Sequence, residues 1–200
     1  MRKRRYKRGG EFRDQRLFII ACEGARREPE YFAALVGRNP RVRIELLHPS
    51  GEQPGGSDPQ RVLQRAVSFA RDNKLRPGDQ MWLVLDIDRW HPKHLRDIVR
   101  QGSQRPQWFV ALSQPCFELW LCFHYEPTPP TDLSCQELKT RLSKFLPQGY
   151  DVTDVVRRTE TALEHARRVD SDPSNAYPDQ RCSKVYLLVE ELWRFVANIV

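Results

Sequence analysis

Acidic residues directly follow two apolar runs of this sequence. Glu23 comes after the run 17–22, and Asp86 and Asp88 come after the run 81–85. If both runs are parallel strands, these acids lie at the carboxyl edge of the sheet, where open α/β sheets bind their ligands. Carboxylates that gather there suit Mg²⁺, which prefers hard oxygen ligands and retains several waters. The alternative is that each acid only caps a helix or opens a turn.

Glu118 is a further acidic candidate, because it lies within the apolar stretch 117–121. An acid in such a stretch is rarely buried unless it is paired or bound to a metal. We interpret it as a metal ligand, a base or a group that orients one. The alternative is a favourable interaction with the dipole of a helix that begins near Pro115. His124, just beyond this stretch, is either a site residue or a structural residue at a helix end.

Strand and helix signals alternate between residues 17 and 125. Short apolar runs predict four strands, at 17–22, 42–47, 81–85 and 108–112. Amphipathic segments between them predict helices, several of which open with a proline in the first turn. This alternation favours an α/β fold with a parallel four-stranded sheet flanked by helices.

Residues 126–134 are rich in proline and interrupt the alternation, and the pattern after them is helical, with one helix predicted over 154–169. We therefore divide the chain into three parts. A basic, flexible arm covers residues 1–16, an α/β core covers 17–125, and a helical extension packed on the core covers 126–200.

The positive charge of the chain is concentrated in the arm. Residues 1–16 contain eight basic and two acidic residues, so they hold most of the net charge of +7. Basic arms commonly contact phosphate backbones without sequence specificity, although a solubilising tail has the same composition. We expect nucleic acid to contact the basic residues of the arm and the two that follow Glu23. These are Arg2, Lys3, Arg4, Arg5, Lys7, Arg8, Arg26 and Arg27.

The composition also limits where the protein acts. No apolar run approaches the roughly 20 residues of a membrane span, and no apolar segment follows the N-terminal charges as in a signal peptide. The five cysteines are odd in number and form no Cys-x-x-Cys pair. This usage is typical of a reducing compartment, so we predict a cytoplasmic protein without a membrane partner.

The chain resembles the RloB family, small bacterial proteins with a Toprim-like core, over most of residues 17–195. The matching stretches are 18–24, 28–32, 82–88, 112–121 and 182–192, and Cys-Phe-Glu-Leu-Trp-Leu at 116–121 is the most specific of them. Toprim domains hold Mg²⁺ with a Glu after the first strand and an Asp-x-Asp after the third. The resemblance therefore implies that Glu23, Asp86 and Asp88 are metal ligands. It also implies that Glu118 is an additional acid of the family.

The resemblance further implies a biological role. RloB-like proteins occur in bacterial phage-defence or restriction-associated loci, often beside an ABC-type ATPase. We therefore expect a nuclease that uses Mg²⁺, with Mn²⁺ as an alternative, and that hydrolyses RNA, such as tRNA, or DNA. Glu23, Asp86, Asp88 and Glu118 would be its catalytic residues, and the ATPase its controlling partner.

The alternative function is a catalytically weak adaptor that holds nucleic acid with its arm and docks a partner through its C-terminal helices. An adaptor does not need the acidic residues, which therefore favour the nuclease. The sequence does not distinguish RNA from DNA. It also leaves the oligomeric state open, a homo-oligomer included.

Overall fold

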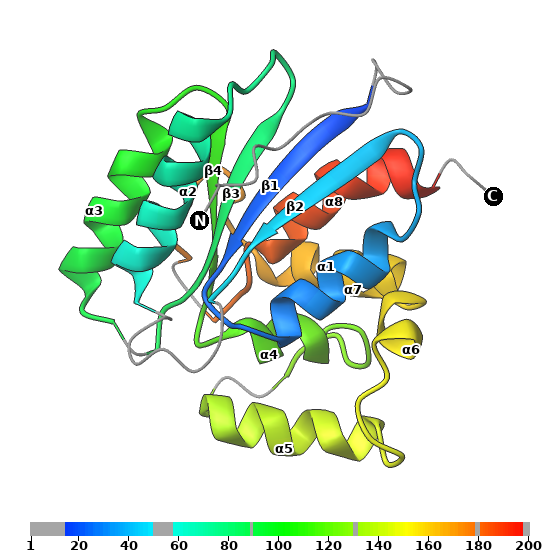
Figure 1. Ribbon diagram of the computed structural model, residues 1–200. Coiled ribbons are helices and arrows are strands. Elements are labelled where there is room, and N and C mark those ends of the chain that lie inside the picture. The colour runs from blue at the N-terminus through cyan, green and yellow to red at the C-terminus, as the bar shows by residue number, and fades with distance from the viewer. Residues whose placement is uncertain (1–14, 50–57, 89, 130–131, 179–180, 198–200) are drawn as a thin grey trace.

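A computed structural model describes residues 15–49, 58–88, 90–129, 132–178 and 181–197. Its centre is a four-stranded parallel sheet in the order β2-β1-β3-β4 (Figure 1). The strands are β1 (Arg16–Cys22), β2 (Val42–Leu47), β3 (Gln80–Asp86) and β4 (Trp108–Ser113). All four predicted strands are present within one residue of their expected bounds. The predicted α/β class with a parallel sheet is thereby confirmed.

The two central strands are buried on both faces, which is why they read as continuous apolar runs rather than as alternating patterns. Along β1, Ile19 packs into one core layer and Ile20 into the other. Leu83 and Trp82 of β3 divide between the same two layers. The sheet therefore separates two hydrophobic cores, and its central strands are held from both sides.

Helices cover both faces of the sheet (Figure 1). One face packs against α2 (Pro59–Asp72) and α3 (Pro92–Ser103). The other packs against α1 (Arg27–Val36), α4 (Phe117–Cys122) and α8 (Val185–Val196). The starts of α2 and α3 combine a capping side chain, from Asp58 and His91, with a proline in the first turn. No helix in the described ranges is both long and apolar enough to span a membrane.

The region after residue 134 forms α5 (Cys135–Phe145), α6 (Val152–Val156), α7 (Thr159–Val169) and then α8. The single helix predicted over 154–169 is therefore wrong, because the chain breaks between α6 and α7. At the break, the hydroxyl of Thr159 donates to the carbonyl of Val156 at 2.6 Å. A Thr side chain offers the backbone such a local alternative to a continuous helix.

The segment before α8 is fastened to the end of β4. The backbone N–H of Lys184 donates to the carbonyl of Leu112 at 2.8 Å, and the hydroxyls of Ser113 and Ser183 are 2.8 Å apart. The ammonium of Lys184 is buried and makes hydrogen bonds of 2.7 and 2.6 Å to the two carboxylate oxygens of Asp170. These contacts fix the chain where β4 leads into α4.

Candidate active site

Glu23 stands at the point where the strand order of the sheet reverses. After β1, the chain first adds β2 on one side of it and then β3 and β4 on the other side. Such switch points form ligand-binding crevices in open α/β sheets. The carboxylate of Glu23 turns toward β3 and accepts hydrogen bonds from the backbone N–H of Asp86 at 2.9 Å and the indole of Trp90 at 3.0 Å. Burial raises the pKa of Glu23 from 4.5 to about 7. The side chain can therefore exchange a proton near neutral pH.

Glu28 is a buried acid beside Glu23 that the sequence reasoning did not include in the site. Its carboxylate folds back from the first turn of α1 and accepts the backbone N–H of Gly24 at 3.0 Å. A Cβ at position 24 would lie 2.0 Å from Oε2 of Glu28, so this approach requires a glycine. Burial, and secondarily the charge of Glu118, raises the pKa of Glu28.

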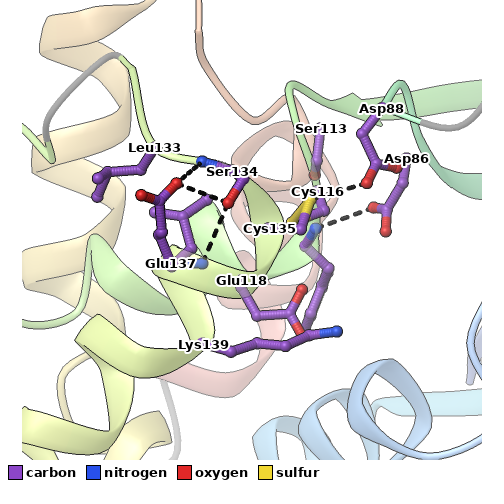
Figure 2. The surroundings of a disulfide bond; sticks show 12 residues. Asp86, Asp88, Ser113, Cys116, Glu118, Leu133, Ser134, Cys135, Glu137 and Lys139 are labelled. Atoms are coloured by element: carbon purple, nitrogen blue, oxygen red, sulfur yellow. Dashed lines mark hydrogen bonds and ion pairs between the residues drawn. A yellow bond between two sulfur atoms is a disulfide. The ribbon is translucent and has the colours of Figure 1, made fainter.

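Asp86 lies at the centre of the acidic residues. Its Oδ1 accepts the backbone N–H of Phe117, the first residue of α4, at 2.9 Å (Figure 2). Exclusion of water raises the pKa of Asp86, and the carboxylates of Glu28, Glu23 and Glu118 raise it further. The ends of β1 and β3 and the first turns of α1 and α4 thus bring four carboxylates into electrostatic contact. We call them the acid cluster: Glu23, Glu28, Asp86 and Glu118.

Asp88 lies at the exposed rim of the acid cluster. Its backbone N–H donates to the carbonyl of Pro115 at 3.1 Å, and its Oδ2 is 3.0 Å from Sγ of Cys135. Cys135 is joined to Cys116 by a disulfide that ties the start of α5 to the start of α4 (Figure 2). Nothing in the spacing of the five cysteines predicts this bond, which differs from the reduced cysteines expected of a reducing compartment.

The acid cluster is chemically suited to a divalent cation. It supplies hard oxygen donors, and Glu28 and Glu23 are 5% and 4% exposed, so their charge is poorly screened by water. Buried carboxylates of this kind are stable when paired or bound to a metal. Within the described ranges, no three His, Cys, Asp or Glu side chains are grouped so that they could hold a metal ion together. Binding of a cation would therefore require side-chain adjustment.

Three cationic or polar side chains reach the acid cluster through contacts with residues far from them in the sequence. Trp90 donates to Glu23, and Lys139 of α5 lies 3.8 Å from Glu118. Arg65 of α2 donates to the carbonyl of Cys22 at 2.8 Å, directly before Glu23. Sequence reasoning missed all three roles because each depends on a long-range contact. The acid Glu28 had a local signal, since it follows Glu23-Gly24 at the start of a helix.

The residues predicted to bind nucleic acid are only partly described. Arg2 to Arg8 of the arm lie outside the described residues. Arg26 pairs with Glu30 at 2.9 Å, and the guanidinium of Arg27 stacks over Tyr150 at 4.0 Å. Both arginines therefore have partners within the protein.

His124 occupies a structural position in the core. It is 1% exposed, its Nε2 is 3.1 Å from the hydroxyl of Tyr31, and its Nδ1 is 3.1 Å from the carbonyl of Trp120. Burial lowers the pKa of His124 to about 3, so its ring is neutral at physiological pH. These contacts give it a role in joining α1 to the end of α4.

Comparison with known proteins assigns most of the chain to a protein family. No solved structure matches the chain. The family model described as RloB-like protein matches residues 18–192, a range that includes the sheet apart from the first two residues of β1, the acid cluster and most of α8. The chain belongs to the RloB-like protein family.

Proposed function

We propose that this protein is a metal-dependent nuclease that hydrolyses phosphodiester bonds of RNA, such as tRNA, or of DNA. The acid cluster is the observation that carries the proposal. Carboxylates whose pKa values are raised by burial and by one another cluster at functional sites, where a bound cation can compensate their charge. Family membership adds the expectation of a Toprim-type reaction.

The acids differ in the roles they suit. Asp86 and Asp88 would hold Mg²⁺, or Mn²⁺ in its place, with Glu23 as a further ligand or as the general base. Glu28 and Glu118 would complete the ligand set or orient it. The metal would supply charge stabilisation on the phosphate and a lowered pKa for a bound water. In the role of general base rather than ligand, Glu23 suits proton transfer, because its pKa in the metal-free protein is about 7. Trp90 and the backbone of Asp86 fix the orientation of its carboxylate.

The biological setting that we propose rests on the family resemblance. RloB-like proteins occur in phage-defence or restriction-associated loci, often beside an ABC-type ATPase. We propose that this chain is the nuclease effector of such a system and that the ATPase controls it in the cytoplasm.

A cleavage assay tests the proposal. End-labelled tRNA, single-stranded DNA and duplex DNA are incubated with the protein in Mg²⁺, Mn²⁺ or EDTA, with and without the ATPase encoded beside it. We expect metal-dependent cleavage of at least one substrate. Asp86→Asn should reduce the rate by about 100-fold or more, because interactions that stabilise transition-state charge have effects of this size.

The control variant is Asp97→Asn, which removes an exposed carboxylate of α3 that pairs with Arg100. Its rate should equal that of the wild type. Cleavage that survives in Asp86→Asn would show that the acid cluster is not the active site. Nucleic-acid binding without cleavage under every condition would favour the adaptor function instead.

A further inference from the structure

Helix α5 lies outside the sheet and is fastened beside the acid cluster at its first residue. The disulfide between Cys135 and Cys116 holds the two Cα atoms 6.0 Å apart. A capping box between Ser134 and Glu137 closes the first turn, with each side chain bonded to the backbone of the other. The start of this helix is therefore fixed relative to α4 and to Asp88.

Lys139 follows Cys135 by four residues, so the two side chains share one face of α5. Its ammonium lies 3.8 Å from Oε1 of Glu118, and its positive charge also acts on Glu28. Figure 2 shows Glu118 and Lys139 together below the disulfide and Asp86. Of the ion pairs between described residues, this is the one that reaches the acid cluster.

The ion pair is not a strong structural contact. The Lys139 side chain is 45% exposed, and exposed pairs at this distance contribute little to stability. The ammonium is thus accessible from solvent, at the edge of the acid cluster that would bind a divalent cation in the active protein. Once a divalent cation compensates the carboxylates, Lys139 is free to attract an anion.

We propose that Lys139 contacts a backbone phosphate of the bound nucleic acid beside the acid cluster. This inference rests on the proposed function and names a substrate contact for it. A lysine ammonium is a compact point charge with three donors that binds phosphate without demanding one orientation. The neighbouring cations Arg26 and Arg27 are directed to Glu30 and Tyr150 instead.

The salt dependence of binding tests this contact without requiring cleavage. Fluorescence anisotropy measures the affinity for a 5′-fluorescein-labelled 20-nucleotide single strand, as RNA and as DNA, in Ca²⁺ and at several salt concentrations. Each phosphate contact contributes about 0.7 to the slope of log K against log salt for single strands. Lys139→Gln should lower the slope by about this amount and weaken binding about fivefold at 0.1 M salt.

Two further variants separate a phosphate contact from a structural effect. Lys139→Arg should retain the wild-type slope, because it keeps the charge. Lys144→Gln removes an exposed lysine from the same helix and should leave both slope and affinity unchanged. A slope and affinity for Lys139→Gln equal to those of the wild type would overturn this inference alone. If the wild type binds only the tRNA or the duplex DNA of the cleavage assay, the same comparison is made on that nucleic acid. Failure of the wild type to bind any of them would instead overturn the proposed function on which the inference rests.

Discussion

Glu23 makes the metal-free protein sensitive to pH in a direction that can be calculated. Its folded pKa of about 7 is above the ordinary 4.5, so the folded state binds a proton more tightly than the unfolded state does. Stability from this group is complete below pH 4.5 and is lost as the pH rises toward and above 7. The rise from 4.5 to about 7 corresponds to at most about 3.5 kcal/mol of unfolding free energy, at about 1.4 kcal/mol per pKa unit.

The variant Glu23→Gln removes this titration but introduces a second effect. Both carboxylate oxygens accept N–H groups, from Asp86 and from Trp90. A protonated carboxyl group can still accept on both oxygens, whereas the amide nitrogen of Gln can only donate. One hydrogen bond is therefore lost and a donor faces a donor, which costs about 1–3 kcal/mol at every pH.

Together, the two effects predict that the unfolding free energies of the wild type and of Glu23→Gln converge as the pH rises. In EDTA at pH 5, wild type should be more stable than Glu23→Gln by about 1–3 kcal/mol. At pH 8, the wild type has lost the contribution of its carboxyl group, so the gap should close or reverse. Urea denaturation followed by tryptophan fluorescence measures both proteins under both conditions. Titrating groups that do not interact with Glu23, such as His124, are present in both proteins and cancel in the difference. Asp86 does not cancel, because the charge of Glu23 raises its pKa, but it makes the wild type lose stability with rising pH in the same direction.

The result that refutes the reasoning is a gap that does not change between pH 5 and pH 8. It would mean that Glu23 has an ordinary pKa in the folded protein. A general base near neutral pH would then have to be another residue.

Three further predictions concern the parts that support the site. Lys184→Met leaves the buried Asp170 carboxylate without its cation and should lower the unfolding free energy by about 3–5 kcal/mol in urea. Burial lowers the pKa of His124 to about 3, so the stability that its neutral ring contributes above pH 6.5 is lost as the pH falls toward 3. The melting temperature of His124→Gln should therefore change less between pH 7 and pH 4 than that of the wild type. The Cys116–Cys135 bond spans 19 residues, so its reduction should cost about 3 kcal/mol, while the same reductant should not change the double variant Cys116→Ser/Cys135→Ser.

The sheet was predictable from the sequence because a strand that is buried on both faces is a short, continuous apolar run. Each strand is a short apolar run, and the acids that end β1 and β3 follow directly from the bounds of those runs. Parallel pairing then brings Glu23 and Asp86 to one edge, where the backbone N–H of Asp86 meets Glu23. Their placement at one edge needed only secondary structure and strand direction, whereas their contact also depends on the pairing of β1 with β3.

The rest of the candidate site depends on contacts that spacing does not encode. Lys139 reaches Glu118 only because α5 folds back across α4, and the Cys116–Cys135 bond depends on the same packing. The break between α6 and α7 likewise depends on the buried Thr159, since no proline or glycine marks it. Amphipathic periodicity reports which face of a helix is apolar, but not where a tertiary contact interrupts it.

The acid cluster depends on the C-terminal segment as well as on the sheet. Asp86 is held by the backbone N–H of Phe117, and the chain that leads into Phe117 is fixed through Gln114, whose N–H donates to the carbonyl of Cys182 at 2.9 Å. That segment is in turn anchored by the buried pair between Lys184 and Asp170. A sheet that ended at β4 would therefore lack the support that positions Asp86. This dependence gives a physical reason why the family match continues to residue 192 instead of ending with the sheet and α4.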